Sequence, residues 1–159
     1  MALSLAGDGT LSGVDIAASG LGRVLQVVRA TDSTQRITTS TSYIDAGISV
    51  TITPTKTTSA IILVAQINAE VQAGTFTRAR LTITDSSGNA ISGAEQAQFG
   101  ARANDDETYD LLSLWAYATP ATTSAVTYKL MGQVTDSGST LVLRNNTCTA
   151  QMYAIEVAA

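Results

Sequence analysis

The densest group of ionisable side chains in the sequence lies in the segment ARANDDETYD. Carboxylates of this kind serve glycosidases as a paired acid and nucleophile, and they serve hard cations such as Ca²⁺ as ligands. Neighbouring carboxylates in an exposed loop repel one another, however, and no other feature of the segment orients them. We therefore interpret it as a solvated loop in which Arg102 pairs with the acids. Three residues are kept as candidate ligands of a bound cation: Asp105, Asp106 and Asp110.

Two residue types that carry much of enzyme chemistry are scarce in this chain. The sequence contains no histidine, which removes the commonest general base and most zinc and triad chemistry. Its one cysteine, Cys148, cannot form an internal disulfide and has no histidine to activate it. We predict that Cys148 is a buried, reduced thiol within an apolar strand. The sequence therefore indicates a protein that is not an enzyme and that uses no cofactor.

The composition is that of a folded domain with an unusual surface. Hydrophobic residues make up 45% of the 159 residues, and charged residues only 14%, where about 25% is typical. Thr and Ser take the polar positions instead, and the β-branched Thr favours strands over helices. Such a weakly charged exterior suits a subunit whose surface is largely covered by neighbours.

Charge and hydropathy exclude two classes of partner. The formal net charge is −4, and the basic residues are dispersed rather than gathered in a stripe, so we expect no nucleic-acid binding. No apolar run approaches the roughly 18 residues of a membrane span, so we expect no membrane insertion.

The clearest secondary-structure element is the stretch GISVTIT, residues 47–53. Its apolar and polar residues alternate with the period of a half-buried strand, and a proline ends it. Residues 60–70 form a continuous apolar run that fits a buried strand or a short helix, and its β-branched residues favour the strand. Further strands are predicted at 24–30, with residues 35–40 close by, and at 76–85, 111–119, 125–134, 140–144 and 147–158. Residues 94–101 also fit a helical turn. About eight strands without a convincing helix predict an all-β fold, an antiparallel β-sandwich of the eight-stranded jelly-roll type.

The chain divides into two zones. Residues 1–22 are rich in glycine yet also apolar, and we interpret them as an extended N-terminal arm. Residues 23–159 form the sandwich domain. The arm is expected to attach the protein to neighbouring subunits through its apolar side chains, because glycine allows close backbone approach. The attachment residues are predicted to be Leu5, Leu11, Val14 and Ile16.

Two stretches resemble proteins of a known class. The opening MALSLAGDGTLSGVD is similar to the start of many tailed-bacteriophage appendage proteins, and STSYIDAGISVTITPTKTTSAIILVAQINAE, residues 40–70, is similar to a segment common in phage fibre and virion-surface domains. Ala60 departs from the lysine that is frequent there. The resemblance covers about a third of the chain and consists of general sequence character rather than a catalytic motif. It implies a trimeric jelly-roll virion protein, similar in outline to tumour-necrosis-factor-like domains.

The resulting hypothesis is a non-enzymatic structural protein on the surface of a tailed-phage virion. A compact knob on an adhesive arm suits a short tail fibre that recognises the host, through a surface glycan or another receptor. The same design suits a head decoration protein that cements the capsid surface. A third interpretation is a carbohydrate-binding module in which an aromatic residue such as Trp115 stacks on a sugar.

The self-association expected for this protein is a homotrimer. Two predicted strands, LLSLWAYAT and TCTAQMYAIEVA, carry apolar residues on both faces, and such strands need cover on both sides. One face belongs to the core of the sandwich. The other is predicted to be a subunit interface formed by Trp115, Tyr117, Tyr153 and Ile155. The alternative is a monomer whose larger loops fold over these strands.

Overall fold

The computed structural model describes residues 4–5, 11–12, 22–72, 77–94, 97–101 and 107–158. Within these ranges every regular element is a strand, as the alternation of apolar and polar residues predicts. No helix of the described part has the length and apolar character needed to cross a membrane. The strands are β1 (Ser4–Leu5), β2 (Leu11–Ser12), β3 (Val24–Asp32), β4 (Arg36–Thr38), β5 (Ile44–Ile52), β6 (Ala60–Gln72), β7 (Thr77–Asp85), β8 (Ala97–Ala101), β9 (Glu107–Ala118), β10 (Val126–Val134), β11 (Thr140–Leu143) and β12 (Ala150–Val157).

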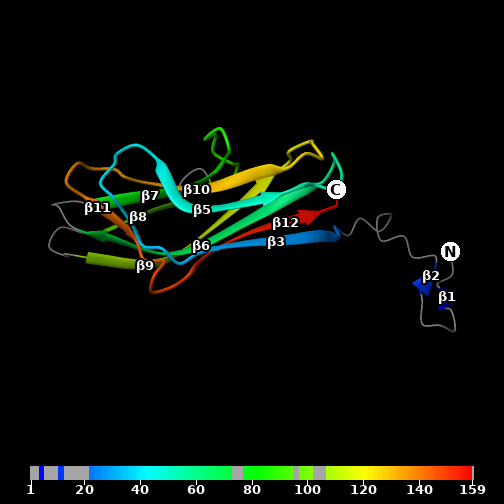
Figure 1. Ribbon diagram of the computed structural model, residues 1–159, viewed down its shortest axis with the longest axis horizontal. Helices are drawn as coiled ribbons and strands as arrows, with labels where there is room; N and C mark the ends of the chain where they lie inside the picture. The colour runs from blue at the N-terminus through cyan, green and yellow to red at the C-terminus, as the bar shows by residue number, and fades with distance from the viewer. Residues whose placement is uncertain are drawn as a thin grey trace.

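The larger sheet has six strands and is organised around β6 (Figure 1). Strand β9 pairs antiparallel with β6 along its whole length, from Ile61 opposite Ala118 to Gln72 opposite Glu107. On the other side of β6, its first half pairs with β12 and its last four residues pair with β11. Strand β3 extends the sheet beyond β12, and β4 extends it beyond β11.

The smaller sheet has four antiparallel strands in the order β5-β10-β7-β8. Figure 1 shows it lying over the larger sheet, so the two form the layers of a sandwich. Strands β1 and β2 form a separate antiparallel pair in which Leu5 lies opposite Leu11. The predicted all-β sandwich of jelly-roll type is confirmed.

The hydrophobic core lies between the two sheets and is supplied by alternate residues of each strand. Burial of these apolar side chains is the main force that holds the layers together. The long strand β6 contributes a fully buried row because its inward positions are all apolar. The largest buried side chains are Ile52, Ile61, Leu63, Ile67, Leu81, Ile83, Leu130, Leu141, Leu143 and Met152.

The structure differs from the sequence prediction in two respects. The sandwich has ten strands rather than about eight, because β4 and β8 are strands as well. Strand β4 lies within residues 35–40, which were expected beside the first strand, and β8 lies in a stretch that also fits a helical turn and has no clear period of its own. In addition, Cys148 is exposed and not buried. Strand β12 begins only at Ala150, and Cys148 lies in the preceding turn, where its amide donates to the carbonyl of Arg144.

A buried carboxylate joins three parts of the fold. The side chain of Glu156 in β12 is fully buried. Its Oε1 accepts hydrogen bonds of 2.7 Å from both the amide and the hydroxyl of Thr55, and its Oε2 accepts one of 2.6 Å from Nε2 of Gln26 in β3. Burial alone raises the pKa of Glu156, but the hydrogen bonds outweigh it and lower the pKa from 4.5 to about 2. The carboxylate is therefore ionised and ties β3, β12 and the turn after β5 together.

Candidate interaction surfaces

The outer side of the six-stranded sheet carries a group of apolar side chains, which we call the apolar face. Strand β9 contributes three exposed members, Leu111, Trp115 and Tyr117, with exposed fractions of 60%, 61% and 53%. The centre and the far side of the face are formed by β6, β12 and β3. Its other members are Ile62, Val64, Tyr153, Ile155 and Val27.

Strand register places most of these residues in two adjacent rows across the sheet. In one row Trp115 and Tyr153 flank Val64 from either side. In the next row Tyr117, Ile62, Ile155 and Val27 follow one another across four strands. Residues that lie opposite one another in neighbouring strands point to the same side of a sheet. The rows therefore form one continuous surface, about 14 Å wide at the usual strand spacing.

The outer side of the four-stranded sheet has a different chemistry. There the hydroxyls of Thr51 and Thr127 are 2.8 Å apart in a hydrogen bond, and Nζ of Lys129 lies 3.9 Å from a carboxylate oxygen of Asp45. These residues face water in the ordinary way of an antiparallel sheet. The contrast between the two outer sides shows that the apolar face is a local feature of one sheet.

The apolar face is as large as the largest apolar patch of a typical monomer. From their exposed fractions, Leu111, Trp115, Tyr117 and Val27 alone leave roughly 500 Å² in contact with water. The largest apolar patch of a typical monomer covers about 300–600 Å² and is often functional. A standard interface buries about 800 Å² on each partner, so the exposed area of these four residues is roughly 60% of that figure.

Two arginines border the apolar face. The guanidinium of Arg29 lies 5.9 Å from the ring centre of Tyr153. The guanidinium of Arg144 lies 5.6 Å from the ring centre of Tyr109 and also pairs with the fully buried carboxylate of Glu70. The cations thus stand at the rim, where a polar border usually surrounds the apolar centre of an interface.

The structure brings all four predicted interface residues onto the apolar face. Trp115 and Tyr117 come from β9, and Tyr153 and Ile155 come from β12, which are separated by β6. The sequence interpretation missed the contribution of β6, whose Ile62 lies between Tyr117 and Ile155. The continuous apolar run of residues 60–70 was the signal, because a strand that is apolar on both sides needs cover on both.

Most of the other predicted site residues lie outside the described part of the chain. Asp110 is half-buried in β9 opposite Ala69, whereas Asp105 and Asp106 lie outside the described residues. The described part of the chain contains no group of three or more His, Cys, Asp or Glu residues that could hold a metal ion. Of the predicted attachment residues, Val14 and Ile16 lie outside the described residues, as do the side chains of Leu5 and Leu11.

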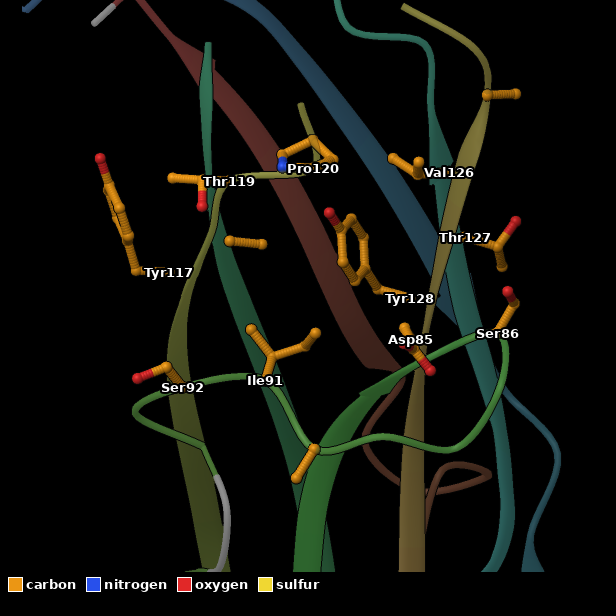
Figure 2. Close-up of a pocket in the computed structure, with 13 residues that line it drawn as sticks. Asp85, Ser86, Ile91, Ser92, Tyr117, Thr119, Pro120, Val126, Thr127 and Tyr128 are labelled. Carbon is orange, nitrogen blue, oxygen red and sulfur yellow. The ribbon is translucent and has the colours of Figure 1, made fainter. Parts of the chain in front are cut away.

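A cavity of about 480 Å³ opens at one end of the sandwich, and no sequence pattern predicts it. It lies where β7 and β9 end and β10 begins, between the turn after β7 and the loop after β9. Figure 2 shows Tyr128, Ile91 and Pro120 in its middle, with Ser86 and Thr127 on one side and Ser92 and Tyr117 on the other. A shallower hollow of about 350 Å³ lies on the neighbouring part of the apolar face, lined by Ile62, Trp115 and Tyr117.

No protein-family model and no curated protein matches this sequence. Solved structures that share the architecture include one of infectious bursal disease virus, Gx strain, at 16% identity and a TM-score of 0.42; the match covers 86% of this chain and 39% of that one. They also include the enzymatically active domain of tailspike protein 4 of bacteriophage CBA120, at 13% identity and a TM-score of 0.31, with 81% and 19% of the two chains covered. A third is the CBM22-1 xylan-binding domain of Paenibacillus barcinonensis Xyn10C, at 11% identity and a TM-score of 0.31, with 86% and 97% covered.

These neighbours include proteins of viruses and a xylan-binding domain. The present chain spans less than half the length of the viral neighbours. At such TM-scores the likeness is one of general architecture and carries no argument about function.

Proposed function

We propose that this chain is a non-enzymatic structural protein of a tailed-phage virion, a trimeric knob on the particle surface that is anchored by the arm of residues 1–22. The observation that carries the proposal is the apolar face, which is uncovered in the single chain. An exposed surface of this size and aromatic content is typical of an interface between subunits. The low charge of the chain and the resemblance of residues 40–70 to virion-surface domains support the same assignment.

Threefold packing accounts for both the face and the arm. A cyclic trimer covers the apolar face of each copy with its neighbours and leaves the polar side of the four-stranded sheet in water. It also gathers three arms around one axis, where they can dock together on the particle. In this arrangement Trp115 and Tyr117 lie in the buried centre of the contact, because large aromatic residues near the centre contribute most to binding.

We assign the knob to a short tail fibre, in line with its opening residues, and a head decoration protein is the alternative. Imaging virions that carry a label on the C-terminus of this chain distinguishes the two. Label at the tail is the expected result. Label spread over the icosahedral shell would assign the protein to the head, and the absence of label from purified particles would refute a virion role altogether.

The arm is tested separately from the knob. Deletion of residues 1–20 is expected to leave a domain that unfolds cooperatively, because the core lies between sheets built from residue 24 onward. The truncated protein should fail to enter particles. If it does not fold, the arm is part of the core; if it enters particles normally, attachment resides elsewhere.

The absence of enzymatic activity is also a proposal and has its own test. Purified protein is expected to release no reducing ends from host polysaccharide. Release that is abolished by Asp105→Asn or Asp110→Asn would instead identify a glycosidase that uses the carboxylates of residues 105–110.

A further inference from the structure

The cavity at the end of the sandwich borders the hydrophobic core at Tyr128 and the apolar face at Tyr117, and its walls combine two kinds of group. Its middle is apolar and aromatic, formed by Ile91, Pro120, Val126 and the ring of Tyr128 (Figure 2). Hydroxyl groups surround this middle. They belong to Ser86, Ser92, Tyr117, Thr119 and Tyr128, whereas the hydroxyl of Thr127 is bonded to Thr51 on the outer side of the sheet. The volume of about 480 Å³ lies in the range of small-molecule sites.

The charges around the cavity restrict what it can bind. The described residues that line it include no Lys or Arg, so nothing there compensates the charge of an anion. The one carboxylate, Asp85, already accepts three hydrogen bonds within its own turn: Oδ1 from the amides of Ser87 (2.8 Å) and Asn89 (2.9 Å), and Oδ2 from Nδ2 of Asn89 (2.9 Å). The hydrogen bonds from Asn89 hold the pKa of Asp85 below its usual value. The carboxylate of Asp85 therefore stabilises the turn that forms this wall, and the uncharged groups that line the rest of the cavity suit a neutral ligand.

The wall formed by the turn after β7 is held in place by a backbone hydrogen bond. The turn after β7 returns along the strand, where the amide of Ile91 donates to the carbonyl of Ile83 over 2.9 Å. In the loop after β9, Ala121 has φ of 53° and is the only non-glycine residue with positive φ in the described part of the chain. A non-glycine residue in this conformation is strained, and strain of this kind gathers at binding sites. A wall that is already in place lowers the entropy lost on binding.

We propose that this cavity binds a neutral saccharide of one or two pyranose rings. The apolar side of a ring packs against Ile91 and Pro120, and the ring hydroxyls exchange hydrogen bonds with the phenol of Tyr128 and the surrounding Ser and Thr side chains. An apolar floor under a border of uncharged hydroxyls matches a sugar, which has an apolar ring face and a polar edge. Burial, and then the charge of Asp85, raise the pKa of Tyr128, so its phenol remains a neutral hydrogen-bonding group.

This inference deepens the proposed host-recognition role and rests on that role for its biological setting, because the cavity names the class of surface molecule that the knob contacts. Its failure and that of the proposed function are distinguishable. Saccharide binding is measured on the purified protein and does not depend on the virion, whereas particle location and subunit number do not depend on saccharide.

The test is a titration of the isotope-labelled full chain, followed by amide chemical shifts in two-dimensional NMR spectra. The probes are the methyl glycosides of glucose, galactose, mannose and N-acetylglucosamine, each added to about 50 mM because a single sugar ring binds with Kd values in the millimolar range. At least one glycoside should shift amides of residues 85–92 and 117–128. If none of the four does so, or if the shifts map to the apolar face instead, the inference is wrong.

Two variants and a control locate the site. Ala90 is exposed and lines the cavity, so Ala90→Trp should fill it and weaken binding by more than about tenfold. Tyr128→Phe removes one hydroxyl without altering the ring, and we expect binding to weaken roughly three- to tenfold. Ser42→Trp places the same bulky side chain on an exposed residue near the opposite end of β5 and should bind as the wild type does. Unchanged affinity in Ala90→Trp would exclude this cavity as the site.

Discussion

Replacement of the buried carboxylate by an amide, Glu156→Gln, should destabilise the protein in a pH-dependent way. The carboxylate accepts on both oxygens, from Thr55 on one side and from Gln26 on the other. An amide of the same shape offers one acceptor oxygen and one NH₂ group, so in either orientation a donor faces a donor. Rotating Gln26 does not relieve the conflict, because its Nε2 also donates to the carbonyl of Thr53 over 2.7 Å.

The expected loss of stability follows from the hydrogen bonds that the substitution removes. Hydrogen bonds to a charged group contribute about 1.5–3 kcal/mol each, so losing one and weakening another should lower the free energy of unfolding by about 2–4 kcal/mol at pH 7. The pKa of Glu156 falls from 4.5 to about 2 on folding, which corresponds to at most about 3–4 kcal/mol of stability. Screening by nearby solvent reduces this figure.

The sign of the pH dependence is fixed by that shift. Because the pKa of Glu156 is lower in the folded state, its contribution is complete above pH 4.5 and is lost as the pH falls toward 2. The stability of the wild type should therefore approach that of Glu156→Gln across this window. Denaturant unfolding at fixed protein concentration, between pH 7 and pH 2.5, measures the difference. Asp136→Asn, which removes an exposed carboxylate, is the control and should change stability by less than about 0.5 kcal/mol at pH 7. A constant difference between wild type and Glu156→Gln over the whole range would refute the reasoning.

Three further predictions concern the backbone and the thiol. Gly47→Ala should destabilise the fold by more than about 1 kcal/mol, because Gly47 has φ of +82° and an added Cβ would lie 1.7 Å from Nε of Arg36. The control is Gly138→Ala, where φ is +95° and the space around the residue is open. In parallel denaturant titrations it measures the cost of the backbone conformation alone. Ala121→Gly should stabilise the protein by up to about 1 kcal/mol in the same titrations. The strain energy relieved at the positive φ is larger than the entropy that a glycine adds to the unfolded chain. A loss of stability would show that Ala121 is not strained. Cys148 should react with a thiol reagent in the folded protein at a rate close to that of the denatured one, and slow labelling would contradict its exposure.

The fold could be predicted from the sequence wherever strands alternate over many residues. Strand β5 shows the period in Ile48, Val50 and Ile52, all of which are buried. Trp115 and Tyr117 of β9 were also assigned to the side away from the core, where both are exposed. Periodicity succeeds here because each side of a strand meets one environment along its length.

The features that could not be predicted depend on contacts between distant segments. The hydrogen bonds of Glu156 join it to residues that are 101 and 130 positions away in the sequence, and no local sequence pattern predicts them. The cavity joins the turn after β7 to the loop after β9, each of which shows only turn-forming residues in sequence. The exposure of Cys148 depends on where β12 begins, and strand ends are the least determined part of a periodic pattern.

The central claim is that the apolar face joins three copies of this chain, and light scattering during size-exclusion chromatography tests it most directly. The wild type should have a mass of about three times the 16.4 kDa chain. The double variant Trp115→Ser, Tyr117→Ser should fall to the single-chain mass, because it removes two exposed aromatic residues from the centre of the contact. The matched control, Thr51→Ser with Thr127→Ser on the polar side of the other sheet, should remain trimeric. A wild-type mass near 16.4 kDa, or a double variant that keeps three copies together, would contradict the account.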